Sequence, residues 1–385
     1  MRVGIALILA LLFLSPLVPI SGGEEGEQLP VGCELSFDGE LANESVGFQT
    51  SLGPRLPGSA ASSALRESIK SNLTGWDIIE STHHVDGMVL TNLFATWNKG
   101  AGSEVIFAAH YDSRAMGDKD WNESRHDEPI DGANDGASGV AVLIELARII
   151  PAMNLTHEVT LFFTDGEDQG SYSPSEGWIL GATAWAENLT QSEADEIESF
   201  ILIDMIGDSD LTLRRAYPSN ASLWNNTVNK IFFLDEVCDL GDSTYLNTEG
   251  YDWIIDDHVP AYNLGIPAID IIDARYGQNV SDPIFGGHWH THNDTADKVS
   301  AESLQKIGYI LESGLITGSW LNIREIDIIN EIDEKSNQID TEPEDVEDID
   351  ENEDDLIIGV LLMACILLVW GNLAWIIFAD NRGEG

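Results

Sequence analysis

The residues best suited to chemistry follow apolar segments rather than lie within them. His110 follows the apolar run 105–109, and Asp112 lies two residues beyond it. Such a run predicts a buried strand, and open α/β sheets bind ligands at the carboxyl ends of their strands. A long polar stretch then closes around Asp135, before a segment whose apolar spacing predicts a helix. Imidazole and carboxylate groups therefore converge, which predicts part of a metal site.

Other segments end in the same way. Glu167 and Asp168 follow the run 158–163, Asp204 follows residues 201–203, and the segment 287–294 contains His288, His290 and His292. Carboxylates mixed with imidazoles suit Zn²⁺, and less specifically Mn²⁺ or Co²⁺. The adjacent carboxylates of Glu167 and Asp168 point in different directions, so one can bind a metal while the other carries protons. Only three cysteines are present, which excludes a thiolate metal cluster.

Strands and helices alternate along the region that must position these groups. Strands are predicted at 88–97, 105–109, 158–163, 200–206 and 266–272, and helices at 64–73, 140–150, 178–188, 223–237 and 301–321. This alternation is typical of an α/β fold. We expect a mixed, largely parallel central sheet with helices on both faces.

The composition divides the chain into six parts. Its apolar start is typical of a secretory signal, with an uncleaved anchor as the alternative. Near the other end the chain becomes too acidic to pack, and an uncharged apolar run then predicts a membrane span. The predicted parts are a signal peptide at 1–23, an N-terminal segment at 24–36, the domain with the candidate site at 37–323, an acidic disordered stalk at 324–355, a C-terminal transmembrane helix at 356–378 and a short cytoplasmic tail at 379–385.

This organisation predicts a single-pass protein of the cell membrane. The C-terminal helix would anchor it, and the domain with the candidate site would lie outside the cytoplasm. Several Asn-x-Ser/Thr sequons agree with export. Cys33 and Cys238 are the candidates for a disulfide, because Cys365 lies in the predicted span.

The charge balance limits the partners of this chain. It has 18 basic and 67 acidic residues, and its formal net charge is −49 at pH 7. This charge argues against nucleic acid and anionic membrane surfaces as partners. It suits a secreted or salt-adapted protein, or one that binds cationic groups such as peptide amino termini. The sequence does not indicate an oligomeric state.

The region 52–321 resembles metallopeptidase family twenty-eight, which contains zinc aminopeptidases and the animal-type glutaminyl-peptide cyclotransferases. The resemblance rests on the motifs GPRLPGS, NLFATW, HYDS, GANDGASG, DGED, LIDMIG, DDHVP, GIPAIDIID and WHTHNDT. These motifs are specific together, whereas GPRLPGS or HYDS alone would be weak. The resemblance implies a zinc-exopeptidase-like fold, one or two Zn²⁺ ions, and peptide substrates with a free N terminus.

The resemblance also implies a role for each candidate metal ligand. Asp135 looks like a carboxylate shared by, or facing, two metals. Asp168 and His290 would complete a first metal site. His110 and Asp204 would complete a second site with Asp135. The family more often has Glu where this chain has Asp168, so the shorter side chain would shift the metal slightly.

Other residues would act around these ligands. Glu167 looks like the general acid/base, Asp112 like the carboxylate that orients the histidine before it, and Asp256 like a member of a proton network beside Glu167. His288 and His292 flank a proposed ligand, and either could replace it. The predicted substrate pocket is lined by Trp289, His292 and Trp178.

Two chemistries fit these residues. With one zinc, an N-terminal glutamine is cyclised to pyroglutamate with release of ammonia; with two, the N-terminal residue is hydrolysed from the peptide. The motifs DDHVP and NLFATW, together with Trp289, favour the cyclotransferase-like branch, whereas Asp270 and Ser173 depart from it. We therefore favour a cyclotransferase-like enzyme acting outside the cell. A two-zinc aminopeptidase is the alternative, and a non-catalytic ectodomain is a remote one.

Overall fold

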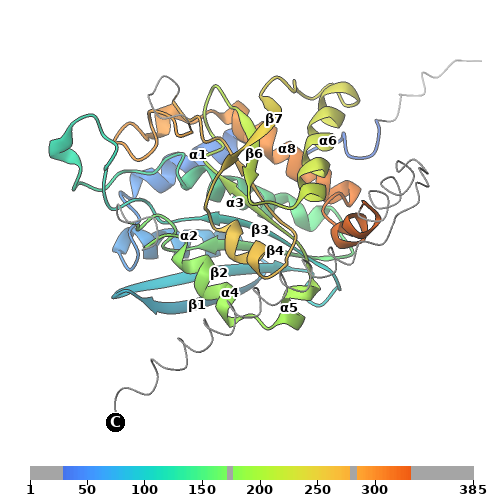
Figure 1. Ribbon diagram of the computed structural model, residues 1–385, viewed down its shortest axis with the longest axis horizontal. Coiled ribbons are helices and arrows are strands. Elements are labelled where there is room, and N and C mark those ends of the chain that lie inside the picture. Colours follow the sequence, from blue (N-terminus) through green and yellow to red (C-terminus); the bar gives the residue numbers. More distant parts are fainter. Residues whose placement is uncertain (1–28, 171–176, 278–283, 331–385) are drawn as a thin grey trace, which may run out of the picture. The chain divides into compact units, whose positions relative to one another are not determined.

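The computed structural model describes residues 29–170, 177–277 and 284–330, which fold around a six-stranded sheet. Figure 1 shows the arrangement of the strands and helices. The strands lie in the order β1-β2-β4-β3-β5-β8. Strands β4, β3, β5 and β8 are parallel, whereas β1 and β2 pair antiparallel with their neighbours. The sheet is therefore mixed and largely parallel, in agreement with the prediction. Its strands are β1 (Asp77–Val85), β2 (Met88–Trp97), β3 (Glu104–His110), β4 (Glu158–Thr164), β5 (Ile197–Asp204) and β8 (Ala268–Ile272).

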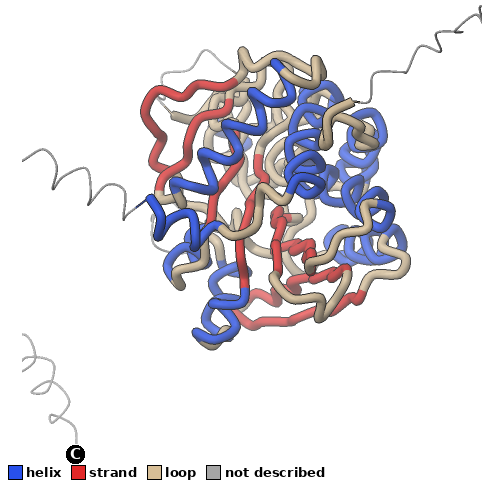
Figure 2. The backbone as a smooth tube through the Cα atoms, turned by 90° about the vertical axis from the view of Figure 1, so that its right-hand side faces the viewer, coloured by secondary structure: helices blue, strands red, loops and turns tan. Residues whose placement is uncertain are grey.

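Helices cover both faces of the sheet, on either side of the strands (Figure 2). Alternate side chains of β3 show the two faces: Phe107 packs in one hydrophobic cluster and Ala108 in another. Side chains of α1 (Gly39–Ser51), α2 (Ala60–Asn72), α3 (Ala137–Ile149), α6 (Ala221–Glu236) and α8 (Ala301–Thr317) belong to the first cluster. Side chains of α4 (Leu180–Asn188), α5 (Gln191–Glu196) and α7 (His258–Asn263) belong to the second.

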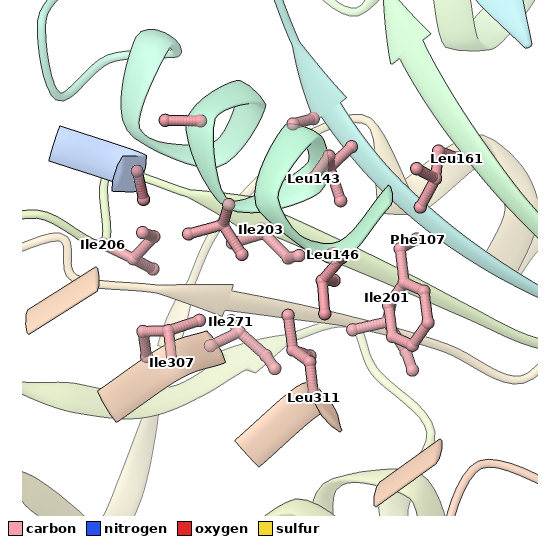
Figure 3. Packing of buried hydrophobic residues seen from close by; sticks show 14 of the residues in the cluster. Phe107, Leu143, Leu146, Leu161, Ile201, Ile203, Ile206, Ile271, Ile307 and Leu311 are labelled. Carbon is pink, nitrogen blue, oxygen red and sulfur yellow. The ribbon is translucent and has the colours of Figure 1, made fainter. Parts of the chain in front are cut away.

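The larger core fixes α3 and α8 against the strands that end at the candidate site. Leu143 and Leu146 of α3 and Ile307 of α8 pack with side chains of the sheet (Figure 3). A Cβ atom at Gly139 would lie 2.2 Å from the carbonyl oxygen of Ile203, so only glycine allows α3 to approach β5 this closely. This contact places the loop before α3 at the carboxyl ends of the strands.

A second, two-stranded sheet is absent from the predicted elements. It pairs β6 (Leu213–Tyr217) in parallel with β7 (Leu246–Trp253). The sequence of β7, LNTEGYDW, is mostly polar, and most of its residues are exposed. Its one alternating stretch, 251–253, is too short to predict a strand.

A disulfide joins Cys33 to Cys238, just beyond α6, with Cα atoms 5.2 Å apart. The two cysteines are 205 residues apart in the sequence. The bond ties the segment before α1 to the end of α6. It thus closes a loop that contains most of the candidate site.

The prediction of a C-terminal transmembrane helix needs correction. Within 29–170, 177–277 and 284–330, no helix is both long enough and apolar enough to cross a membrane. The fold class that the described residues support is a mixed α/β fold, and neither the C-terminal transmembrane helix nor the single-pass membrane location is supported by them. The predicted signal peptide, the span at 356–378 and the tail lie outside the described residues, as does most of the predicted stalk. Arg324, at the predicted start of the stalk, still donates hydrogen bonds to the carbonyl oxygens of Ala194 and Ile197.

Candidate metal centre and active site

The first group of possible metal ligands lies where two neighbouring parallel strands end. His110 is the last residue of β3, and Asp204 is the last residue of β5. Nε2 of His110 lies 3.2 Å from Oδ1 of Asp204 and 3.1 Å from Oδ1 of Asp135. All three side chains are buried. The carboxyl edge of the sheet therefore collects an imidazole and two carboxylates.

The second group lies on the other side of Asp135. Nε2 of His290 lies 3.9 Å from Oδ2 of Asp135 and 3.3 Å from Oδ1 of Asp168. Asp168 follows β4, whereas His290 lies in the connection between β8 and α8. Asp135 thus presents one carboxylate oxygen to each histidine, as a carboxylate facing two metal sites would.

Both groups fit zinc. In each group, one donor atom from every residue lies within 4.8 Å of the others, and zinc binds imidazole nitrogen and carboxylate oxygen at about 2.0–2.2 Å. Oδ2 of Asp168 is buried and has no hydrogen-bond partner within the described ranges, an unfavourable state that a cation would relieve. Burial also raises the pKa of Asp168 and of Asp204, because it disfavours an uncompensated charge.

Asp112 connects the first histidine to the turn that follows β4. Its Oδ1 lies 3.5 Å from Nδ1 of His110 and accepts a hydrogen bond of 3.1 Å from the backbone N–H of Glu167. Its Oδ2 accepts a hydrogen bond of 3.2 Å from the backbone N–H of Asp168. Asp112 therefore contacts the two residues predicted to bind metal and move protons, in addition to the histidine that it was predicted to orient.

Glu167 lies in a small cavity that Asp135, Asp204 and Asp256 also line. Burial, followed by the negative charge of Asp256, raises the pKa of Glu167 well above its usual value. Burial and the charges of Asp204 and Asp257 raise the pKa of Asp256 in the same way. Perturbed carboxyl groups in a cavity are typical of residues that take up and release protons during catalysis.

The buried acids continue to Asp270 on β8. Its pKa is raised well above the usual value by burial and by the charges of Asp256 and Asp204. Asp270 was one of the two residues that depart from the cyclotransferase-like branch, and Nδ1 of His258 lies 4.0 Å from its Oδ2. Burial lowers the pKa of His258 to about 4, which keeps it neutral. An imidazole therefore borders the acids from α7.

Aromatic and aliphatic side chains form the rest of the cavity wall. Trp178 and Trp289, both predicted to line the pocket, do so, and both rings stack on His290, with centroids 5.9 and 3.5 Å away. The cavity has a volume of about 60 Å³. Sequence reasoning missed five lining residues: Met205, Ile254, Ile255, Ile272 and Phe285.

His292, the third residue predicted for the pocket, does not line the cavity. Its Nδ1 lies 2.8 Å from Oδ2 of Asp120, in the long loop after β3. His288 instead packs edge-on against Tyr276, with ring centroids 5.2 Å apart. In the part of the chain that the structure describes, neither histidine belongs to a group of possible metal ligands. His290 is the histidine of this segment that faces Asp135 and Asp168.

Arg114 is a buried cation that sequence reasoning missed. Its Nη1 donates a hydrogen bond of 2.7 Å to Oδ1 of Asp168, and its Nε donates one of 2.6 Å to Oδ1 of Asp118. Nδ1 of His290 lies 3.4 Å from the same oxygen of Asp118. Arg114 therefore binds the oxygen of Asp168 that also lies 3.3 Å from Nε2 of His290, and it leaves Oδ2 without a hydrogen-bond partner in the described ranges. Its position directly after the HYDS motif could have indicated that Arg114 lies near the site.

Two buried side chains fix the loop that carries Asp135. The guanidinium group of Arg55 donates hydrogen bonds to the carbonyl oxygens of Tyr111, Asp131 and Gly132, at 3.1, 2.6 and 2.7 Å. The Asp294 carboxylate accepts hydrogen bonds from the backbone N–H groups of Asn134 and Asp135. A cation thus binds the carbonyls before the turn, and an anion binds the amides within it.

We expect Arg55→Met to lower the free energy of unfolding by about 3 kcal/mol, because three carbonyl oxygens lose a charged donor. Denaturant unfolding measures the change. Arg125→Met is the control, since the ion pair of Arg125 with Glu128 is solvent-exposed and its loss should cost less than about 1 kcal/mol. Equal losses in the two variants would show that Arg55 does not brace the loop.

Comparison with known proteins agrees with this geometry. The model of the family described as Peptidase family M28 matches residues 92–313. A glutaminyl-peptide cyclotransferase from Gloydius blomhoffii is 25% identical over 309 residues, covering 69% of this chain and 78% of the relative. A glutaminyl cyclase from Porphyromonas gingivalis superposes with a TM-score of 0.63 and 32% identity, covering 72% of this chain and 96% of the other. A Zn-dependent exopeptidase from Parabacteroides distasonis superposes with a TM-score of 0.65 and 30% identity, covering 73% of this chain and 99% of the other.

Proposed function

The chain belongs to peptidase family M28, and we propose that it is a zinc-dependent enzyme that converts the N-terminal glutamine of peptides to pyroglutamate and ammonia. The observation that carries this proposal is the position of Glu167, in a cavity between the metal donors and an aromatic wall. The relatives that are named glutaminyl-peptide cyclotransferase and glutaminyl cyclase support the same reaction.

The donor groups assign the metal ligands in this proposal. Asp135, Asp168 and His290 would hold one zinc ion, and His110 and Asp204 would hold a second together with Asp135. When bound, zinc supplies Lewis-acid polarisation of a substrate carbonyl oxygen. Binding, orientation and proton transfer remain with the side chains of the protein.

Glu167 would move the proton that cyclisation requires. The α-amino nitrogen of glutamine attacks the γ-carbonyl carbon, and the carboxylate of Glu167 removes a proton from that nitrogen. The new C–N bond closes the five-membered ring. Glu167 then returns the proton to the departing amide nitrogen, which leaves as ammonia when its bond to the γ-carbon breaks. Burial and the charge of Asp256, which also lines the cavity, raise the pKa of Glu167 and so favour its protonated form between the two transfers.

The cavity wall favours cyclisation over hydrolysis. Trp178, Trp289 and Phe285 line the cavity beside Glu167, and Phe285 stacks on Trp289 with ring centroids 4.0 Å apart. With a substrate bound, these apolar surfaces would limit the access of water to the carbonyl carbon, so the α-amine of the substrate would meet less competition as a nucleophile.

One observation favours a two-zinc aminopeptidase as the alternative. The two oxygens of Asp135 face different histidines, and all the donors of a second site are present. In that reaction Glu167 would take a proton from water rather than from the substrate amine.

The test offers two substrates to the purified, zinc-loaded full chain. A Gln-initiated peptide should release ammonia and keep a blocked N terminus, and leucine p-nitroanilide should remain intact. Release of a free amino acid from either substrate would instead identify a peptidase. If neither substrate reacts, the proposed enzyme function is wrong.

A further inference from the structure

A row of large apolar side chains stands exposed beside the cavity. Tyr251, Trp253 and Ile255 are 58%, 57% and 63% exposed. They alternate along an extended segment with Asp252, Ile254 and Asp256, which are less exposed or buried. Alternate side chains of an extended chain point to opposite faces, so one face of this segment is apolar and open to solvent. We call Tyr251, Trp253 and Ile255 the aromatic ridge, after its two aromatic members.

The opposite face of the segment connects the ridge to the candidate site. Ile254 and Asp256 line the cavity that contains Glu167. Ile255 also lines the cavity although it is largely exposed, so it marks the cavity mouth. Successive ridge residues are about 6.6 Å apart in an extended chain, which puts Tyr251 roughly 13 Å from this mouth.

The ridge is held in place by the small sheet. Tyr217 on β6 stacks on Trp253 with ring centroids 4.5 Å apart, and its ring lies 5.2 Å from that of Tyr251. Asp252 forms ion pairs with Arg214 and Arg275 on the other face of the strand, at 2.8 and 3.0 Å. A contiguous, preorganised apolar surface is more typical of a binding site than isolated exposed residues are.

The cavity is too small to contain a peptide. Its volume of about 60 Å³ is well below the roughly 300–1,000 Å³ of pockets that enclose a drug-sized ligand. Only the first residue of a substrate can be enclosed, even in part. The residues that follow must leave through the mouth, where Ile255 lies.

We propose that the aromatic ridge binds the two or three substrate residues after the N-terminal one and selects peptides with apolar or aromatic side chains at these positions. This inference rests on the proposed function, because the occupant is a peptide whose N-terminal residue lies in the cavity. Aromatic side chains are strong contributors to peptide binding because they bury a large rigid surface.

The test compares glutamine amide, which has no following residue, with Gln-Phe-Phe-amide and Gln-Gly-Gly-amide on the zinc-loaded full chain. Wild type should prefer Gln-Phe-Phe-amide. In Trp253→Ala, the ratio of kcat/KM for Gln-Phe-Phe-amide to that for glutamine amide should fall roughly tenfold, which corresponds to the loss of one well-packed aromatic contact. Phe48→Ala removes an aromatic side chain that is 44% exposed on α1, and it should leave the ratio at the wild-type value.

The possible outcomes distinguish failure of the ridge proposal from failure of the proposed function. If all three substrates react and Trp253→Ala leaves the ratio unchanged, the ridge does not bind substrate, while the proposed function stands. If no substrate reacts, the proposed function is wrong. Calorimetric titration with Gln-Phe-Phe-amide then tests whether the ridge binds a peptide. Weaker binding to Trp253→Ala than to Phe48→Ala would then support the ridge, and equal binding would overturn it.

Discussion

The Glu167→Gln variant is expected to turn over a Gln-initiated peptide roughly 10³-fold more slowly than the wild type while it binds the same amount of zinc. Glutamine has nearly the same shape as glutamate, so it preserves the packing of the cavity, but it cannot accept a proton from the substrate amine. Glu167 belongs to neither group of possible metal ligands within the described ranges, so its replacement should spare the metal.

Three measurements test this expectation together. Atomic absorption gives the zinc content, steady-state kinetics give kcat, and thermal unfolding reports the fold. The melting temperature should not fall, because the substitution removes a charge that burial and Asp256 disfavour. Glu187→Gln on the exposed end of α4 is the matched control and should behave as wild type. Loss of zinc in Glu167→Gln would mean that Glu167 and Asp168 have exchanged roles.

The geometry of parallel strands explains why much of the site could be predicted. His110 and Asp204 each end an apolar run, and parallel neighbours bring their carboxyl ends to one edge of the sheet. Asp135 and Asp168 follow from the same logic, since each lies in a loop after a strand on that edge. The local sequence pattern was therefore enough to predict a site residue when that residue lies at, or just after, the carboxyl end of a strand.

Residues that reach the site from distant segments could not be predicted in this way. Arg55 binds carbonyls more than fifty residues away in the sequence, and Ile255 follows a strand that is mostly polar. His292 fails for a different reason. His290 has a φ angle of 56°, in the left-handed region, which the sequence does not predict, and His292 contacts Asp120 rather than the cavity.

The balance of charge in the site links metal binding to folding. Asp135, Asp168 and Asp204 are buried together, and Arg114 pairs directly with only one of them, Asp168. Repulsion among uncompensated buried carboxylates destabilises the folded state. A bound divalent cation attracts the same carboxylates and so stabilises the folded state. Substitutions of these residues should therefore change zinc content and thermal stability together, and the two readouts can be interpreted jointly.

Asp135→Asn should remove all bound zinc and all measurable turnover, because Asp135 belongs to both donor groups. The amide has lost the negative charge that each metal site requires. Asp204→Asn changes only the group at the end of β5. A one-zinc cyclotransferase should keep its metal and most of its activity in Asp204→Asn, whereas a two-zinc aminopeptidase should lose one equivalent of zinc and its hydrolytic activity.

Zinc content per chain, measured on dialysed protein beside the wild type, decides between these outcomes. Asp195→Asn on the exposed surface of α5 controls for the loss of one carboxylate and should retain wild-type zinc and activity. If Asp135→Asn keeps both zinc and turnover, the shared-ligand assignment is wrong for either reaction. If wild type binds two equivalents and Asp204→Asn binds one and is inactive, the second group is a working metal site, and hydrolysis replaces cyclisation as the function that the geometry supports.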